Sequence, residues 1–518
     1  MGAHVTRTNP IVWLILCLTT IPCGLFAAES DLPGSILPPV SLRDSWIREY
    51  KPRYINSIQD LNETPSDATC LSIRVVDRDV ESALTRFEQL RFLELLFGTL
   101  SGPALARLLS HPRLECLVID NCDAPSMPNG EALRVLVKRL RIGSNLGVLR
   151  ALLGSQTAQD CLLEVDLRHC DAGDADIEFL AKCQSLHAID ASFNTRLSRQ
   201  AIRKLFMLPT RMLFLNGVKL GDDCVPDEVA NSTIERLSLG GVPSLNDSIL
   251  QQLARMQSLR VLSLESARAN TSITDKGIAS ITSLKNLTFL GLPAAKLVSA
   301  EGLRTLTKMK LTGVAGGLDI LASRSKFEAV FSGGSYQAVF LWINPTSIPG
   351  ECMRLLGQHA IRQLSITFSD RITDHLDFLP SLKRLEELTI CSLGVDDRIL
   401  QLIGNVPKLS SLAIGGENKF TGAGLRCVAG MPHLTSLSLA YLPALGRGEI
   451  EVLYKCPSLR ELMIGNSEHI SKDLLIGFRK LRLRRLTVGG VTALSADDIT
   501  VVREELGDCI VEVFGASR

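Results

Sequence analysis

The sequence predicts an α/β fold organised as a solenoid, with a curved parallel β-sheet on its concave face and helices on its convex face. Three observations predict it. The motif L-x-x-L-x-L returns about every 24 residues along most of the chain. A residue suited to begin a helix follows many copies, and a proline often stands just before the next copy. Because such units contact only their neighbours, a chain of 518 residues needs no separate globular domains.

Each copy of the motif predicts a short strand. Clear copies begin at Leu114, Leu259, Leu287, Leu385, Leu434 and Leu459. The leucines of such a strand alternate toward the core, and the residues between them point to the opposite face. Every unit contributes one strand in the same direction, so the strands form a parallel sheet whose outward residues line the concave face.

The segment after each motif predicts a helix. Suitable first positions are held by Ser198, Asn246, Thr274, Thr373, Ser471 and Ser495. Apolar residues then recur at helical spacing, as at Ile278, Ile281 and Leu284. Several helices are expected to end at a proline just before the next motif: Pro112, Pro407, Pro432 and Pro457. Helices are wider than strands, so a stack of these units curves.

Over roughly residues 68–515 this pattern resembles the leucine-rich-repeat superfamily. The segment ITDKGIASITSLKNLTFLGL is similar to the helix-backed, cysteine-containing class. Cys122 and Cys170 fall where that class places its cysteine, and Asn145 and Asn194 where other members place asparagine. Most other units hold Val, Ala, Ser or Gly there, so any ladder of these side chains is discontinuous. The resemblance extends to exported bacterial proteins of the planctomycete type and implies protein binding.

The first 28 residues are expected to be a cleavable export signal. Arg7 precedes an apolar run over residues 11–26, and the small residues Ala27 and Ala28 follow. The chain is therefore expected to be secreted, periplasmic or at the cell surface. An uncleaved anchor is the alternative, although the run is short for a membrane span. The twelve cysteines after this signal are expected to be buried thiols, and disulfides are the alternative.

Four further segments follow the signal. Residues 29–67 are expected to form a linker and a cap, in which Leu42, Trp46 and Ile47 cover the first unit. Residues 68–310 hold the N-terminal repeats and 351–518 the C-terminal repeats with a closing strand. Between them, 311–350 is rich in glycine and predicts an irregular repeat. A hinge between two domains is the alternative for that stretch.

Composition and motifs narrow the function. The formal net charge is only +1, from which no nucleic-acid partner is expected. The sequence has no nucleophile elbow, phosphate-binding loop or zinc-protease motif, so we expect neither an enzyme nor a cofactor. Two aspartates and a histidine of the concave face, Asp166, Asp190 and His169, are too few ligands for calcium, so no metal site is expected. No F-box-like segment is found before the repeats, which disfavours a substrate-receptor adaptor.

The richest outward positions lie in the N-terminal half of the predicted sheet. The third outward residue of successive strands gives Glu94, Val118, Arg141, Asp166, Asp190 and Phe214, then mostly small residues, with Trp342 beside Ser365. A partner-binding surface is predicted at Arg141, Asp166, Arg168, His169, Asp190, Phe193, Phe214 and Asn216. The alternative is a solvated face whose arginines neutralise the aspartates.

A second candidate surface consists of Phe340, Trp342 and Phe368, with packing beneath the irregular repeat as its alternative. The sequence thus predicts a non-catalytic scaffold that recognises a protein through the concave sheet face. A structural envelope or cell-surface repeat protein without a single ligand is the alternative. A hydrolase would need a compact insertion, and neither 29–67 nor 311–350 is long enough for one.

Overall fold

The computed structural model describes residues 41–123, 135–143, 156–265, 272–293, 295–317, 320–321, 323–343, 348–371, 374–416, 418–440, 442, 445–465, 469–490 and 494–514. The predicted export signal over 1–28 lies outside these residues and stays a prediction. Asn145 and Thr373 also lie outside them. The chain divides into two units, Ile36–Ile320 (the N-terminal unit) and Leu321–Arg518 together with Met1–Ser35 (the C-terminal unit).

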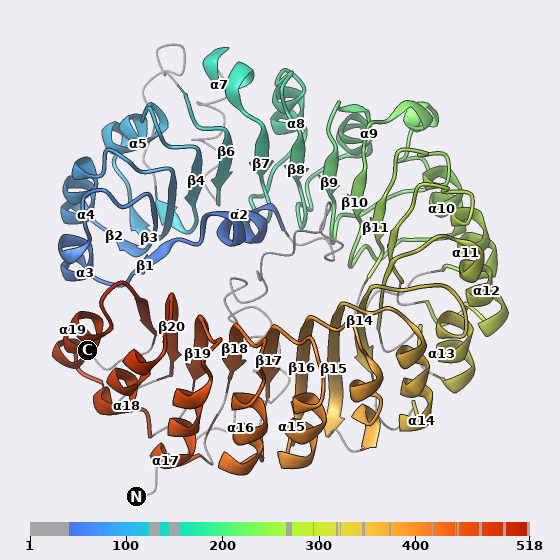
Figure 1. Cartoon of the computed structure of the whole chain (residues 1–518). Coiled ribbons are helices and arrows are strands. Elements are labelled where there is room, and N and C mark those ends of the chain that lie inside the picture. Colours follow the sequence, from blue (N-terminus) through green and yellow to red (C-terminus); the bar gives the residue numbers. More distant parts are fainter. Residues whose placement is uncertain are drawn as a thin grey trace, which may run out of the picture. The chain divides into compact units, whose positions relative to one another are not determined.

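The N-terminal unit alternates strands and helices (Figure 1). Its described strands are β1 (Arg53–Ile55), β2 (Cys70–Val76), β3 (Phe92–Thr99), β4 (Cys116–Ile119), β5 (Cys122–Asp123), β6 (Arg139–Ile142), β7 (Glu164–Asp166), β8 (Ala188–Asp190), β9 (Met212–Phe214), β10 (Arg236–Ser238), β11 (Val261–Ser263), β12 (Phe289–Gly291) and β13 (Gly313–Gly316).

Its described α-helices are α2 (Leu42–Tyr50), α3 (Ile58–Glu63), α4 (Arg78–Ala83), α5 (Gly102–Leu109), α7 (Gln156–Cys161), α8 (Asp174–Leu180), α9 (Arg199–Met207), α10 (Asp247–Leu253), α11 (Asp275–Ile281) and α12 (Ala300–Arg304). Short 3-10 helices are η2 (Leu84–Arg86), η4 (Asp227–Asn231) and η5 (Thr305–Lys308).

The C-terminal unit has the same alternation. Its described strands are β14 (Ala338–Ile343), β15 (Gln363–Arg371), β16 (Glu387–Leu393), β17 (Ser411–Gly415), β18 (Ser436–Leu439), β19 (Glu461–Gly465), β20 (Arg485–Gly489) and β21 (Ile510–Phe514). Its described α-helices are α13 (Arg324–Phe331), α14 (Gly350–Met353), α15 (Asp397–Gly404), α16 (Gly422–Ala429), α17 (Arg447–Ile450), α18 (Lys472–Gly477) and α19 (Ala496–Leu506). Its 3-10 helices are η6 (Arg354–Gln358), η7 (Asp374–Leu376), η8 (Leu379–Ser381), η9 (Glu451–Lys455) and η10 (Phe478–Lys480).

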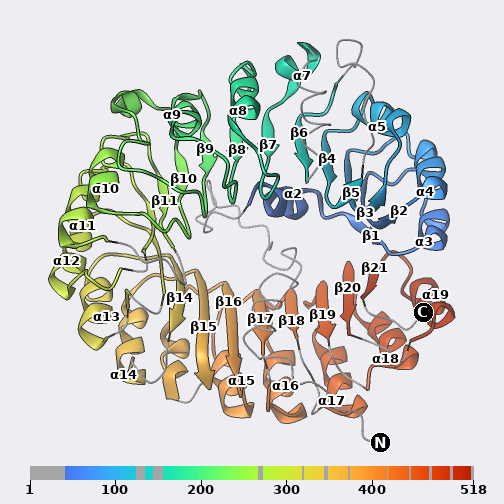
Figure 2. The ribbon, with the colours of Figure 1, turned by 180° about the vertical axis from the view of Figure 1, so that it is seen from behind.

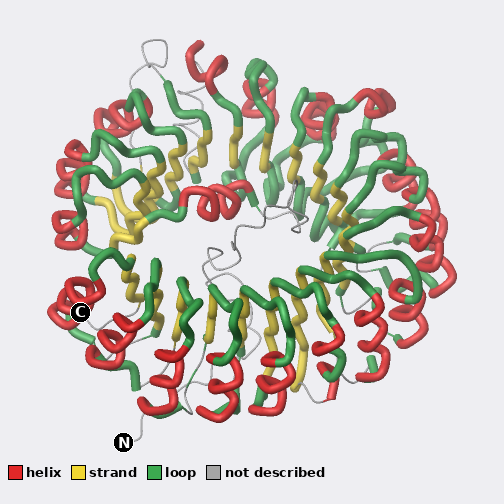
Figure 3. Tube along the Cα trace, in the orientation of Figure 1, coloured by secondary structure: helices red, strands yellow, loops and turns green. Residues whose placement is uncertain are grey.

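Within each unit the successive strands pair in parallel, as predicted. Strand β7 pairs with β6 and β8, for example, and β16 pairs with β15 and β17. Parallel neighbours require a crossover connection, which the helices supply. Figure 3 shows these strands on the inner side of each unit and the helices on the outer side. The leucine-rich-repeat solenoid fold predicted from the motif is therefore confirmed.

The repeat leucines form the core between sheet and helices. The second leucine position of the motif is buried in one strand after another: Leu71, Leu93, Leu117, Leu140, Val165, Ile189, Leu213, Leu237, Leu262 and Leu290. Burying a branched aliphatic side chain contributes about 1.5–3 kcal/mol, so a column of them is the main stabilising feature of the stack.

Side chains at the predicted ladder position bind backbone of the preceding unit. The amide nitrogen of Asn194 donates to the carbonyl oxygen of Leu167 in the preceding unit at 2.9 Å, and also to that of Ala191 in its own unit at 3.0 Å. The thiol of Cys170, one unit earlier, donates to the carbonyl oxygen of Ile142 at 3.0 Å. The twelve cysteines of the described residues are all free, and nine of them are buried. The nine buried cysteines therefore serve as small core residues.

The outer helices begin where the caps predicted them. The side chains of Ser198, Asn246, Thr274, Ser471 and Ser495 each accept a hydrogen bond from a backbone N–H in the first turn of their helix. No helix in the described part of the chain is both long enough and apolar enough to cross a membrane.

Candidate functional site

The outward residues of neighbouring strands in the N-terminal unit stand in register, as predicted. Arg141 pairs with Asp166, Asp166 with Asp190, and Asp190 with Phe214. These positions are one strand apart, about 4.8 Å. The arginine, the two aspartates and the phenylalanine thus form one row across β6 to β9.

The predicted register of Trp342 was wrong. Trp342 lies beside Thr367, and Phe340 is the residue beside Ser365. The motif of this unit starts two residues earlier than the sequence suggested, because Tyr336, only 1% exposed, fills the core place that leucine holds elsewhere.

The row in the N-terminal unit is not an open surface. Asp166 and Asp190 are fully buried, and Arg141 and Phe214 are each 4% exposed. Helix α2 lies over these strands on the face opposite the other helices, as both views of the ribbon show (Figures 1 and 2). The solvated-face alternative is therefore wrong for these four residues.

We expected α2 to cap the first unit of the array, but it does not. Its apolar residues Leu42, Trp46 and Ile47 are buried in one cluster with Phe92, Cys116, Val118, Ala188 and Phe214. These partners lie on strands β3, β4, β8 and β9, so the helix crosses the concave face of the unit. Large apolar residues at outward positions gain more from this contact than from covering one terminal repeat.

Polar contacts fix α2 on the sheet. The Arg43 guanidinium pairs with Glu94 at 2.6 Å, and the Trp46 indole N–H donates to Glu164. Tyr50 donates its hydroxyl proton to Glu115 at 2.9 Å. The helix thus has an apolar stripe with charged or polar anchors at both ends.

Beneath α2, Arg141 is held by two carboxylates. It pairs with Asp166 at 2.6 Å and with Asp120 at 3.2 Å. Arg168, half-buried, reaches Asp44 of α2 at 4.0 Å, and its backbone N–H donates to Asp166 at 2.9 Å. Buried charges with this many partners position the helix and the strand ends.

Asp190 is the least compensated charge of the row. Its Oδ1 accepts from the backbone N–H of Ser192 at 3.0 Å, and its Oδ2 is buried with no hydrogen-bond partner among the described residues. Burial, and then the neighbouring Asp166 carboxylate, raise the pKa of Asp190 to about 7. The two aspartates cannot both ionise there without cost.

His169 and Phe193 lie at the strand ends and remain exposed. Their rings stack with centroids 4.5 Å apart and planes 3° apart. Both residues adopt left-handed backbone, with φ of 57° and 59°, a conformation that costs a bulky residue about 1–2 kcal/mol. Gly217 holds the equivalent place one unit later and lies against the Phe193 ring. Burial, then the nearby arginines, lower the pKa of His169, so the stacked imidazole is neutral near pH 7.

Asn216 serves the backbone and side chain of the next unit. Its side-chain oxygen accepts from the Ser238 hydroxyl at 2.6 Å and from the Gly240 N–H at 2.7 Å. Of the eight residues predicted as the first surface, only His169 and Phe193 are therefore well exposed.

The second predicted surface is partly formed. Phe340 and Trp342 are half-buried at outward positions of β14. Phe368 is 1% exposed, pairs in register with Ile343, and packs edge-on against His375 at 5.9 Å. Phe368 therefore belongs to the core, which confirms the packing alternative for that residue.

A row of charged residues at the amino ends of the strands was missed. Backbone hydrogen bonds connect this row directly, since each N–H donates to the carbonyl of the residue one strand earlier at 2.6–2.9 Å: Arg91, Glu115, Lys138, Leu163, His187, Arg211, Glu235 and Arg260. We call the cationic residues in and beside this row the basic edge: Arg91, Arg113, Lys138, Arg139, Arg211, Arg236 and Arg260. Tabulating the second and third positions of every motif copy would have found most of them.

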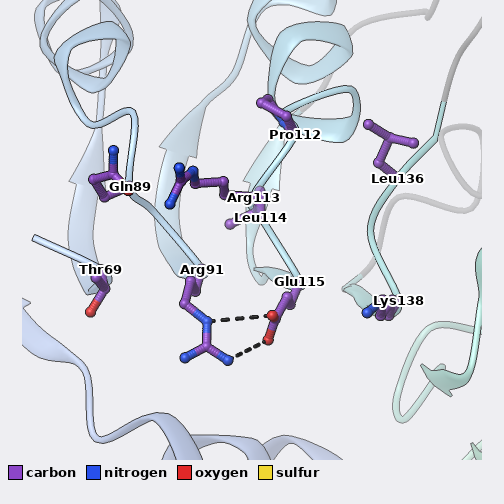
Figure 4. A pocket seen from close by; sticks show the side chains of 9 residues that line it. All are labelled: Thr69, Gln89, Arg91, Pro112, Arg113, Leu114, Glu115, Leu136 and Lys138. Carbon is purple, nitrogen blue, oxygen red and sulfur yellow. Dashed lines mark hydrogen bonds and ion pairs between the residues drawn. The ribbon is translucent and has the colours of Figure 1, made fainter.

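Two open pockets lie on the basic edge. One, of about 350 Å³, is lined by Arg91, Arg113, Glu115 and Lys138 among others (Figure 4). Arg91 there pairs with Glu115 at 2.9 Å. The other pocket, of about 330 Å³, is lined by Glu164, His187, Arg211, Met212, Glu235 and Arg236 among others.

The described residues contain no group of three or more histidine, cysteine, aspartate or glutamate side chains that would hold a metal ion. Stacking on Phe193 occupies one face of the His169 ring, and the Cys170 thiol beside it donates to a backbone carbonyl. Burial raises the pKa of that thiol to about 12, so it is a poor nucleophile.

No family model matches the chain. A curated protein of Caenorhabditis elegans, EEED8.10, whose name marks it as a candidate RNA-binding protein, is 25% identical over 274 residues. The match covers 52% of this chain, and this chain spans only 31% of the length of that relative.

Solved structures also resemble the chain. An internalin of Listeria monocytogenes is 17% identical with a TM-score of 0.38, and the match covers 71% of this chain and 94% of the internalin. A complex of TLR13 with single-stranded RNA is 13% identical with a TM-score of 0.40, covering 89% of this chain and 62% of that one. The mouse RP105/MD-1 complex is 15% identical with a TM-score of 0.38, covering 86% and 74%.

The expectation that excluded nucleic acid from the partners of this chain is contradicted by the C. elegans relative, which is named for RNA binding. That expectation rested on the net charge of +1. A sum over the chain does not describe a surface such as the basic edge, where cations gather locally.

Proposed function

We propose that this chain is a non-catalytic scaffold that recognises a protein partner through the concave face of its sheet. The proposal rests on the contacts that hold α2 on the concave face of the sheet. Its cluster on β3, β4, β8 and β9 buries Trp46, 1% exposed, and its polar anchors use three acidic side chains: Glu94, Glu115 and Glu164. A concave face of this repeat is therefore chemically suited to hold an amphipathic helix.

In the C-terminal unit we place the partner at Phe340 and Trp342. These two rings rise from β14 beside the smaller residues Ser365 and Thr367. The indole Nε1 of Trp342 is buried without a hydrogen-bond partner among the described residues. An unpaired buried donor costs about 1–3 kcal/mol, which a partner that supplies an acceptor would recover. Aromatic anchors of this kind dominate many protein interfaces.

Affinity capture with the whole chain tests this proposal. We expect wild type to retain a specific protein from the source organism, and Trp342→Ala to lose it. Trp342→Phe, which keeps an aromatic ring and removes the donor, should bind more weakly than wild type. Phe179→Ala, on helix α8, is the matched control and should bind normally. If the wild-type chain retains no stable partner, the structural repeat protein without a single ligand becomes the better description.

RNA is the second candidate partner. The name of the C. elegans relative favours it, and so does the local excess of cations at the basic edge. The two candidates use different surfaces, since Trp342 lies in the C-terminal unit and the basic edge in the N-terminal unit. Substitutions in one therefore leave the other unchanged.

We also propose, from the resemblance of the repeats and the first 28 residues, that the chain is an exported bacterial protein. A fusion of residues 1–35 to a reporter that is active only after export tests this in a bacterial host. Reporter activity should disappear when the apolar run is interrupted by Leu16→Arg. A fusion that stays in the cytoplasm contradicts the proposal.

A further inference from the structure

The basic edge has a linear arrangement. The backbone ladder from Arg91 to Arg260 spans eight consecutive positions, so its ends are about 34 Å apart at 4.8 Å per strand. The basic edge has seven cations, and four carboxylates accompany them: Glu115, Glu164 and Glu235 of the row and its neighbours, and Glu49 of α2, which pairs with Arg139 at 2.7 Å. This excess of three positive charges lies along one line, whereas the whole chain carries only +1.

Several of these cations are available to a ligand. Arg113, Lys138 and Arg211 are exposed and form no ion pair with any described residue. Arg91 and Arg260 pair with Glu115 and Glu235, but their side chains are 54% and 65% exposed. Exposed pairs of this type contribute little and exchange readily for another anion.

The two open pockets lie between the cations. The first presents the apolar surfaces of Pro112 and Leu136 beside Arg91 and Lys138 (Figure 4). The second presents Met212 beside Arg211 and Arg236. Charges that follow a line, with partly apolar openings between them, fit a polymer that alternates anionic groups with flat apolar groups.

We propose that the basic edge is a docking surface for single-stranded RNA, with Lys138 and Arg211 contacting phosphates and the two pockets receiving bases. This inference rests on the second candidate function and assigns its surface. Single-stranded RNA is favoured over an acidic protein because the row is long and narrow, and because it is interrupted by base-sized openings. A duplex would need a wider surface.

The test measures binding of the whole chain to a fluorescent single-stranded RNA of mixed sequence by anisotropy, at several salt concentrations. The variant Lys138→Glu/Arg211→Glu reverses two edge charges. The control Arg107→Glu/Lys276→Glu reverses two exposed charges on the outer helices α5 and α11, so both proteins have the same net charge. Circular dichroism and thermal unfolding check that each variant folds.

We expect the edge variant to bind at least tenfold more weakly than wild type, and the control to bind within about twofold of wild type. The slope of log K against log salt should fall by about 1.4 in the edge variant, since each phosphate contact on a single strand contributes about 0.7. Equal loss in both variants would show unspecific attraction and overturn the proposal.

Three further outcomes separate the inference from the function on which it rests. If wild type binds RNA and the edge variant binds equally well, the surface is wrong while RNA remains the partner. If wild type binds no RNA at all, both the inferred surface and the second candidate function are wrong. If wild type binds poly-glutamate but no RNA, and the edge variant no longer binds poly-glutamate, the basic edge is a site for an acidic protein. The RNA assignment is then overturned.

Discussion

Asp190 shows how the covered concave face adds a pH dependence to the fold. Its carboxyl group is fully buried beside Asp166, and burial raises its pKa to about 7. In the unfolded chain the same group titrates near 4. Between these two values the folded state keeps a proton that the unfolded state has lost. The free energy of unfolding therefore falls as pH rises from about 4 to about 7.

We expect Asp190→Asn to remove this dependence. Asparagine is neutral at every pH and offers an N–H to Asp166 Oδ2, which is buried with no hydrogen-bond partner among the described residues. The variant should gain stability over wild type as pH is raised from 5 to 8, on the order of 2–4 kcal/mol. Urea unfolding at pH 5 and pH 8 measures it, with Asp67→Asn as an exposed control. A difference between variant and wild type that does not change with pH would contradict the assignment.

At the scale of single elements, α2 couples distant strands. Residues 42–50 contact side chains from β3 to β9, so one short helix connects several repeats that otherwise meet only their neighbours. Nearest-neighbour stacks lose cooperativity when a connection of this kind is removed.

Trp46→Ala should therefore be destabilising beyond its own position. Loss of a fully buried tryptophan costs about 3–5 kcal/mol. We also expect faster amide hydrogen exchange in β4, β7 and β8, which the helix covers, and little change in β11 to β13. Trp46→Phe keeps most of the apolar contact and loses the bond to Glu164. Its stability and its exchange rates should therefore lie between those of wild type and Trp46→Ala. If Trp46→Ala changes amide exchange in β4, β7 and β8 no more than in β11 to β13, α2 does not couple these strands.

Between the outer helices, an aspartate of one unit binds the first turn of the next. Asp275 accepts from the backbone N–H and the hydroxyl of Ser299 at 2.7 and 2.6 Å. Gly302 gives it room, since a Cβ there would lie 2.1 Å from Asp275 Oδ1 and 2.5 Å from its Cγ. The same contacts recur between Asp397 and Thr421, so this is a repeated connection of the outer face.

Gly302→Ala should displace Asp275 and break both of its bonds to Ser299. The expected loss is about 1–3 kcal/mol of unfolding free energy. Gly448→Ala is the matched control, because it is helical and its added methyl group meets nothing within 4 Å. That change should stabilise the protein by about 0.5–1 kcal/mol. Equal effects of the two substitutions in chemical unfolding would show that the Asp275 contact is unimportant.

Over the whole molecule, the parts that could be predicted are those that repeat. The motif placed Asp166, Asp190 and Phe214 in the correct register because each strand is set by its own leucines. The position of α2 could not be predicted, since its contact with β7 to β9 joins segments more than a hundred residues apart and has no periodic signal. The register of β14 failed for a related reason, because Tyr336 replaced the leucine that marks the motif.

The candidate sites also differ in whether a repeating pattern of the sequence marks them. Whether the concave row is exposed depends on which segment covers it, and the repeat motif gives no information about that segment. The basic edge, by contrast, was present in the sequence as a column at fixed motif positions, with Arg91, Lys138 and Arg211 in equivalent places. A total charge near zero concealed it, because acidic residues elsewhere cancel its cations.

The distribution of the cysteines through the repeats gives a test of the whole described fold. All twelve after residue 40 are free thiols, and only Cys70, Cys161 and Cys427 are partly exposed. Reactivity requires access and ionisation, and burial raises the pKa of thiols such as Cys170. We expect a brief alkylation of the native protein, read site by site by mass spectrometry, to label these three residues first. The other nine should react only in denaturant. Fast labelling of Cys116, which lies on β4 in the cluster beneath α2, would mean that the concave face of the N-terminal unit is open in solution.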